Sequence, residues 1–133
     1  MTSMTVAEVT ALYGRQSQAI DDGAAADWAA CFTADGSFHS PTYGEPIVGT
    51  EALTAFAAEV YQDMQSQGLR QRHWINNVVV DAQAGTASAY LMIVRIDAEG
   101  TPSLLRHVVF SDQLAVDGDG QLRVRARSVR RDP

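Results

Sequence analysis

The stretch RQRHWINNVVVD, residues 70–81, is the most informative part of the chain for its fold. It places His73, Trp74, Asn76 and Asn77 directly ahead of a run of three valines, and such a β-branched run predicts a strand. Because side chains alternate along a strand, His73 and Asn77 are expected on one face, and Trp74 and Asn76 on the other. Polar side chains that interleave with a strand in this way indicate a face that lines a polar space.

Upstream of this stretch, the apolar residues recur with the period of a helix. Three helices are predicted, at residues 5–22, 24–32 and 51–66. Thr5 and Glu8 have the spacing of a capping box at the start of the first helix, and Thr50 is expected to cap the third. Between the second and third helices, the sequence predicts a turn at 33–37, a short strand at 37–40 and a loop at 41–49.

From residue 70 onward the apolar pattern changes to the period of a strand. Strands are predicted at residues 70–81, 85–97, 102–117 and 121–131, and the DGDG sequence at 117–120 is the clearest hairpin signal. Helices followed by an antiparallel meander are typical of an α+β fold. A curled sheet with helices over its concave face would enclose a pocket, and residues 1–133 are expected to form one domain.

Alternation divides the last predicted strand into two faces. The inward face would carry Leu122, Val124, Ala126, Ser128 and Arg130, and the outward face Arg123, Arg125, Arg127, Val129 and Arg131. The outward arginines are interpreted as a solvated row, with a subunit contact or an anionic partner as the alternatives. An inward Arg130 would need a carboxylate or a ligand oxygen as its partner.

Composition and charge exclude several classes of function. The formal net charge of −6 argues against a nucleic-acid partner, and no apolar run is long enough for a membrane span, so a cytoplasmic location is expected. The chain has no lysine, which rules out Schiff-base catalysis by a lysine. Cys31 is alone, so neither an intrachain disulfide nor a multi-cysteine zinc site can form.

Among the three histidines, only His73 has a plausible carboxylate partner, Asp21 at the end of the first predicted helix. A carboxylate on one ring nitrogen fixes the tautomer and raises the basicity of the other nitrogen. The sequence contains no compact catalytic or metal-binding motif. The remaining chemistry is therefore general acid–base catalysis by His73 and Asp21 in an apolar pocket, without a metal or an organic cofactor.

Three segments together resemble the SnoaL-like branch of the nuclear transport factor 2 (NTF2-like) superfamily. They are AIDDGAAADWAACFTADGSF (19–38), PIVGTEAL (46–53) and RHWINNVVVD (72–81). The resemblance implies a cone-shaped α+β fold, with three N-terminal helices on a curved, mainly antiparallel sheet around a pocket. It also implies a homodimer through the sheet and a small-molecule ligand.

Several members of this superfamily are cofactor-free enzymes, such as scytalone dehydratase, the hexachlorocyclohexane dehydrochlorinase and the bile-acid dehydratase. They share a histidine on the strand after the third helix and an aspartate at the end of the first, which resemble His73 and Asp21 here. The arginine near the end of the last strand of the bile-acid enzyme resembles Arg130. The chain departs from these enzymes at Gln16 and Ile93, where family members carry acid groups, and Ser40 stands where ketosteroid isomerases carry their base.

The leading hypothesis is a cofactor-free dehydratase, isomerase or cyclase that acts on a fairly apolar molecule such as a polyketide, steroid or aromatic intermediate. His73 would be the base and Asp21 its orienting partner. The residues expected to bind substrate are Arg130, Tyr13, Gln16, Asn77 and Trp74. The alternatives are a non-catalytic ligand-binding or dimerisation module, and an epoxide hydrolase that would need an Asp–Arg–Asp set.

Overall fold

A computed structural model describes residues 4–133 of the chain. Its helices are α1 (Val6–Asp21), α2 (Ala25–Ala30) and α3 (Thr50–Ser66). Its strands are β1 (Phe32–His39), β2 (Ile47–Val48), β3 (Arg70–Asp81), β4 (Thr86–Ile96), β5 (Pro102–Val116) and β6 (Leu122–Arg130). No helix within this described part is long and apolar enough to cross a membrane.

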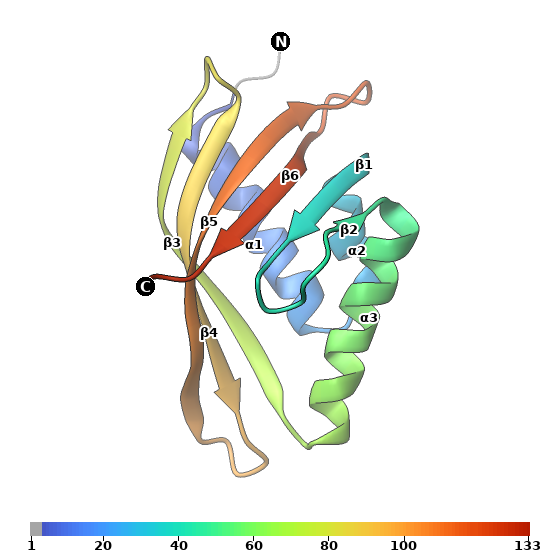
Figure 1. The fold of residues 1–133 in the computed structure, drawn as a ribbon, viewed down its shortest axis with the longest axis vertical. Coiled ribbons are helices and arrows are strands. Elements are labelled where there is room, and N and C mark those ends of the chain that lie inside the picture. The colour runs from blue at the N-terminus through green and yellow to red at the C-terminus, as the bar shows by residue number, and fades with distance from the viewer. Residues whose placement is uncertain (1–3) are drawn as a thin grey trace.

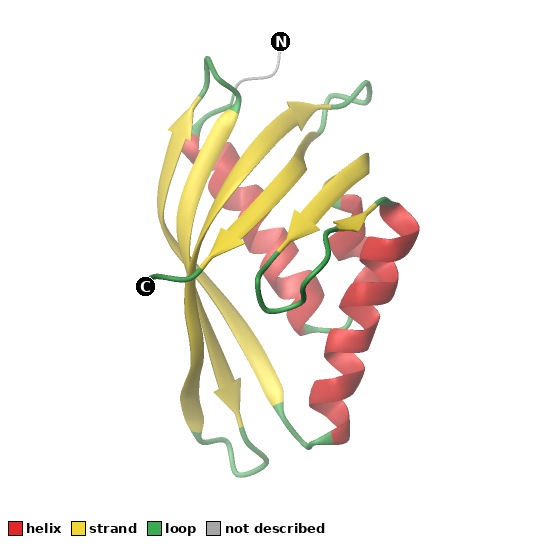
Figure 2. Ribbon diagram, viewed as in Figure 1, coloured by secondary structure: helices red, strands yellow, loops and turns green. Residues whose placement is uncertain are grey.

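The strands form one six-stranded sheet in the order β2-β1-β6-β5-β4-β3. The predicted antiparallel meander of β3, β4, β5 and β6 is confirmed, and β1 joins it by pairing in parallel with β6. The sheet is strongly curled, and the three helices lie on one side of it (Figures 1 and 2). The predicted α+β class, with three helices against a curved and mainly antiparallel sheet, is therefore confirmed.

The helices are held to the sheet by a continuous apolar core. α1 begins where predicted, because the side chain of Thr5 accepts a hydrogen bond from the backbone N–H of Glu8 at 3.1 Å. Its buried stripe includes Val9 and Leu12, which are at most 1% exposed. Burying such side chains removes apolar surface from water, which stabilises the fold by about 25 cal/mol for each Å² of apolar surface buried.

An aromatic cluster joins α2, α3 and β1 at the other side of the core. The ring of Trp28 lies 4.9 Å from that of Phe32, 5.9 Å from that of Phe38 and 5.6 Å from that of Phe56, measured between centroids. Such tilted and edge-to-face contacts are the favoured geometries of aromatic pairs. The cluster fixes the short helix α2, which has no side-chain cap of its own.

The segment around residues 31–37 differs from its prediction. α2 ends at Ala30, and β1 already begins at Phe32, so the residues expected to form a turn lie within a strand. The register between β1 and β6 shifts between Phe32 and Ser37, which accommodates the turn-forming residues as an irregularity of the strand. A Cβ atom on Gly36 would lie only 2.8 Å from the Cβ of Phe32, so this close approach requires glycine.

A β-bulge in β6 reverses the predicted alternation of the last strand. Gln113 pairs with Ala126 but Leu114 pairs with Val124, which leaves Arg125 as the extra residue. One extra residue moves every later side chain to the opposite face. The predicted inward position of Arg130 and outward position of Arg127 are therefore both wrong: Arg127 is 7% exposed, whereas the Arg130 side chain is 65% exposed.

A second bulge lies in β3. Asn76 pairs with Tyr90 and Val79 with Ser88, so β3 has one more residue than β4 in this interval. Asn77 has a φ of 58°, in the left-handed region where asparagine is better tolerated than most residues. His73 and the start of the strand keep the predicted face, but Val79 turns outward and is 65% exposed.

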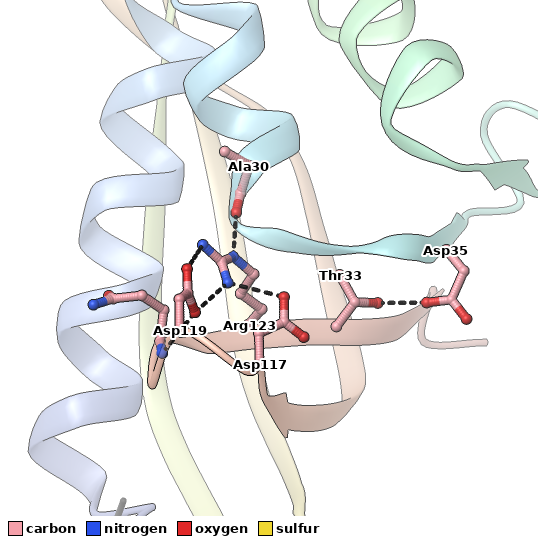
Figure 3. A network of polar contacts seen from close by, with 7 residues as sticks. Ala30, Thr33, Asp35, Asp117, Asp119 and Arg123 are labelled. Carbon is pink, nitrogen blue, oxygen red and sulfur yellow. Dashed lines mark hydrogen bonds and ion pairs between the residues drawn. The ribbon is translucent and has the colours of Figure 1, made fainter.

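Arg123 is also not part of a solvated arginine row, because it joins the β5–β6 turn to the end of α2 (Figure 3). Its Nε donates to the carbonyl oxygen of Ala30 at 3.0 Å, and its terminal nitrogens donate to Asp117 and Asp119 at 2.8–2.9 Å. The carbonyl of Ala30 is one of those that a helix leaves without a partner at its C-terminus. Arg123 therefore anchors α2, the helix that carries Trp28.

Candidate active site

The two residues at the centre of the sequence hypothesis meet in the structure. Asp21 is the last residue of α1, and His73 lies near the start of β3. Asp21 Oδ1 lies 2.6 Å from His73 Nδ1, and Asp21 Oδ2 accepts the backbone N–H of His73 at 2.9 Å. The side chains are 5% and 14% exposed, respectively. Asp21 therefore holds both the backbone and the ring of His73.

This contact determines how the imidazole can act. An ionised carboxylate only accepts hydrogen bonds, so the proton of a neutral His73 ring lies on Nδ1 and is donated to Asp21. The lone pair on Nε2 is then available to accept a proton. A carboxylate in this position also stabilises the imidazolium that forms after proton transfer. The pair therefore has the arrangement of a general base with an orienting partner.

His73 lines a cavity of about 140 Å³ between α2, α3 and the concave face of the sheet. Most of its wall is apolar, including Ile20, Trp28, Phe38, Phe56, Leu91, Ile93, Val108 and Val129. The polar side chains in the wall are Ser40, Tyr43, Asp63, Gln71, His73, Arg106 and Arg127. A concave and mainly apolar site with a few polar groups is typical of a small-molecule pocket.

Arg127 connects this cavity to a buried polar cluster behind it. Its Nε and Nη2 donate to the two carboxylate oxygens of Asp112, both at 2.8 Å. Nη2 also donates to Gln16 Oε1 at 2.9 Å, and the hydroxyl of Tyr13 donates to Asp112 Oδ2 at 2.7 Å. The guanidinium lies 4.2 Å from the ring centroid of Phe110. Arg127 is therefore fixed as a rigid wall of the cavity.

The charges in this cluster support one another. Burial disfavours the charged guanidinium of Arg127, but Asp112, with a smaller contribution from Tyr13, outweighs this effect, so the pKa of Arg127 is raised. Burial, together with the charge of Asp112, raises the pKa of Tyr13 far above its ordinary value. The amide oxygen of Gln16 accepts the hydrogen bond from Arg127, and within the described residues the Gln16 Nε2 group is a buried donor without a partner.

Comparison with known proteins identifies the family. Residues 2–128 match the SnoaL-like domain family, which is nearly the whole chain. The chain belongs to the SnoaL-like domain family. This result confirms the resemblance inferred from the sequence, including membership of the NTF2-like superfamily.

Three solved structures are similar to this SnoaL-like domain. ActVI-ORFA from Streptomyces coelicolor has 28% identity and a TM-score of 0.84, covering 95% of this chain and 93% of its own. Aln2 from a Streptomyces species has 30% identity and a TM-score of 0.81, covering 95% and 89%. A protein from Catenulispora acidiphila, in complex with S-DNPA, has 26% identity and a TM-score of 0.80, covering 92% and 90%. A search of curated proteins found no match.

The other residues expected to bind substrate do not line the cavity of this SnoaL-like domain. Tyr13 and Gln16 are buried behind it, where they hold Asp112 and Arg127 rather than facing a ligand. Asn77 is exposed in the β3 bulge, and Trp74 is 55% exposed on the outer face of the sheet. Arg130 lies outside the cavity, with its Nη1 atom 3.9 Å from Oδ1 of Asp132.

Sequence alternation alone does not identify Arg127 and Arg106 as residues of the cavity wall. Simple alternation puts Arg127 on the outer face, because no residue pattern reveals the bulge at Arg125. Arg106 lies in a strand that was predicted correctly, but its face was not assigned. In this SnoaL-like domain, both arginines can be identified only once the register of β5 is known.

The buried hydroxyl of Tyr13 gives an expected pH dependence of stability. Because the pKa of Tyr13 is raised above its ordinary value of 10.0, the folded protein keeps this proton at a pH where the unfolded chain loses it. The stabilisation is complete below pH 10.0 and is lost as the pH rises above it, by about 1.4 kcal/mol per pH unit. Urea unfolding of wild type and Tyr13→Phe between pH 9 and 12 measures this slope. An equal slope in the two proteins would contradict it.

Proposed function

We propose that this protein is a cofactor-free enzyme that transfers protons on a fairly apolar small molecule, as a dehydratase, isomerase or cyclase. The observation that carries the proposal is the 2.6 Å contact between His73 Nδ1 and Asp21 Oδ1 at the wall of an apolar cavity. Both partners of this contact are largely shielded from water, which strengthens a charged hydrogen bond.

In this mechanism His73 Nε2 removes a proton from a carbon next to a carbonyl group or a leaving group. Asp21 orients the ring and stabilises the imidazolium that results. Negative charge then develops on the substrate. Arg127, fixed in the cavity wall, provides a positive group that can stabilise this charge. Arg127 thus takes the role that the sequence assigned to Arg130.

A role in binding a ligand without turnover is the second candidate. Ile93 lies beside His73 in the sheet, and Gln16 contacts Arg127, so neither provides the acid found at the matching positions of related enzymes. The complex of the Catenulispora acidiphila protein with S-DNPA supports ligand binding in either case. For an epoxide hydrolase, Arg127 would need two aspartates, but its contacts are Asp112 and Gln16.

The proposal is tested with 5-nitrobenzisoxazole, an uncharged bicyclic molecule that opens to a coloured phenolate when a base removes its C–H proton. The wild-type protein is expected to accelerate this elimination with saturation kinetics, because the cavity binds the molecule beside His73. Saturable binding of the probe without acceleration would favour the ligand-binding role instead.

We also propose that the protein forms a homodimer through the outer face of its sheet. Trp74, Met92 and His107 lie in one row across β3, β4 and β5, and Tyr90, next to this row, is 48% exposed. Leu104 at 60% exposure extends the same apolar surface. Exposed apolar patches of this kind mark interaction surfaces.

Trp74→Glu is expected to shift the protein from dimer to monomer, because it would bury a charge within this surface. Sedimentation velocity over a range of protein concentrations measures the shift. Val6→Glu is the matched control, since Val6 is also 53% exposed but lies on α1, away from the outer face. A wild-type protein that stays monomeric at high concentration would contradict the proposed dimer.

A further inference from the structure

Arg106 is a cation in the cavity wall that has no ion-pair partner among the described residues. Its side chain is half-buried and lines the same cavity as His73. Among residues 4–133, no carboxylate lies within 4.0 Å of its guanidinium, and no hydrogen bond from it is formed. Arg127, by contrast, already has Asp112 as its ion-pair partner. A partly desolvated guanidinium without a partner retains its full capacity to bind an anion.

The strand register places Arg106 at a defined distance from His73. His73 pairs with Ile93, and Ile93 pairs with Arg106, so the three residues form one row across β3, β4 and β5. All three line the cavity. Neighbouring strands are about 4.8 Å apart, so the backbones of His73 and Arg106 are separated by about 10 Å. The apolar side chain of Ile93 lies between the two polar groups.

A bulge and an aromatic ring determine the position of Arg106. The register of β4 and β5 shifts after Ile93, which leaves Leu105 as an extra residue next to Arg106. Bulges of this kind redirect side chains near functional sites. The guanidinium also lies 6.0 Å from the ring centroid of Tyr43, at the outer limit of a cation–π contact. Arg106 is thus directed into the cavity before any ligand arrives.

We propose that Arg106 binds the carboxylate of a substrate whose apolar body lies over Ile93 and whose reacting C–H group lies at His73. This inference rests on the proposed function of the cavity and adds the class of substrate, a ring-containing carboxylic acid. The planar guanidinium matches the two oxygens of a carboxylate. One unpaired arginine, with Asp63 in the same wall, suits a single negative charge better than a phosphate dianion.

The test compares two probes with the same ring, the anionic 2-naphthylacetate and the neutral 2-naphthylacetamide, by isothermal titration calorimetry on the full chain. The wild type is expected to bind the carboxylate at least about tenfold more tightly than the amide, as for a charged hydrogen bond. In Arg106→Gln this preference is expected to disappear, while the affinity for the amide changes little.

Two variants are the controls. Arg130→Gln removes the same charge from an arginine that is 65% exposed outside the cavity, and it should keep the preference. His73→Asn should keep it as well, because the preference belongs to Arg106 and does not depend on proton transfer. A preference that persists in Arg106→Gln, or equal binding of both probes by the wild type, would overturn the proposal. If the wild type prefers the carboxylate but does not accelerate the opening of 5-nitrobenzisoxazole, the proposed function is rejected and the role of Arg106 is kept.

Discussion

Replacing Asp112 by alanine is expected to lower the free energy of unfolding by about 3–5 kcal/mol. The substitution leaves the guanidinium of Arg127 in the interior without its carboxylate, and it removes the acceptor of the Tyr13 hydroxyl. The Asp112 side chain is fully buried, so the substitution removes these bonds at a position away from bulk water. Urea unfolding followed by circular dichroism at neutral pH measures the loss.

The double variant Asp112→Leu with Arg127→Met measures how strongly the stabilising effects of Asp112 and Arg127 depend on each other. Because it removes both charges together, the double variant is expected to be less destabilised than the sum of the two single changes. Asp119→Ala is the comparison for an exposed carboxylate, since the Asp119 side chain is 54% exposed, and it should change stability far less. Additive effects in the double variant would show that Asp112 and Arg127 do not depend on each other.

Replacing His73 by asparagine is expected to lower the rate of 5-nitrobenzisoxazole opening by about 10²–10⁴-fold, the usual contribution of a positioned base. Asparagine keeps a polar side chain of similar size but cannot accept the proton at neutral pH. Asp21→Asn should also reduce the rate strongly, because an amide no longer fixes the ring proton on Nδ1. Single-turnover absorbance measurements give both rates.

His39→Asn is the matched control, because His39 is an exposed histidine that does not line the cavity. It should leave the rate unchanged, whereas free imidazole at the same concentration gives the background of an unpositioned base. Thermal unfolding of each variant establishes that the fold is retained. Equal rates in wild type and His73→Asn would remove the proposed mechanism, whatever the affinity for the probe.

Much of the fold could be predicted because its patterns are local. The stretch 70–81 forms β3 with the predicted bounds, and the capping residues of α1 are those that the sequence indicated. The contact between Asp21 and His73 was inferred from a plausible pairing and a family resemblance, and the structure brings the two residues together. These features depend on residue type and spacing, which a sequence displays directly.

The remainder depends on how strands are paired, which no single strand reveals. The assignments of Arg127 and Arg130 were reversed because the extra residue Arg125 is visible only against β5. Thr33 to Gly36 have the composition of a turn, but they lie within β1, in the irregular stretch between Phe32 and Ser37, the residues on either side that pair with β6. For the same reason, the alignment of Arg106 with His73 could not be seen before the register of two strand pairs was known.

The bulge at Arg125 has a consequence for how relatives of this protein should be compared. Because Arg125 is an extra residue, every side chain of β6 after it lies on the face opposite to the one that simple alternation predicts, although the strand continues in the same direction. A relative that lacks this one residue would present a differently numbered arginine to its cavity. Equivalent arginines should therefore be matched by the face they occupy, and deletion of residue 125 alone is expected to exchange the interior and exterior of the second half of β6.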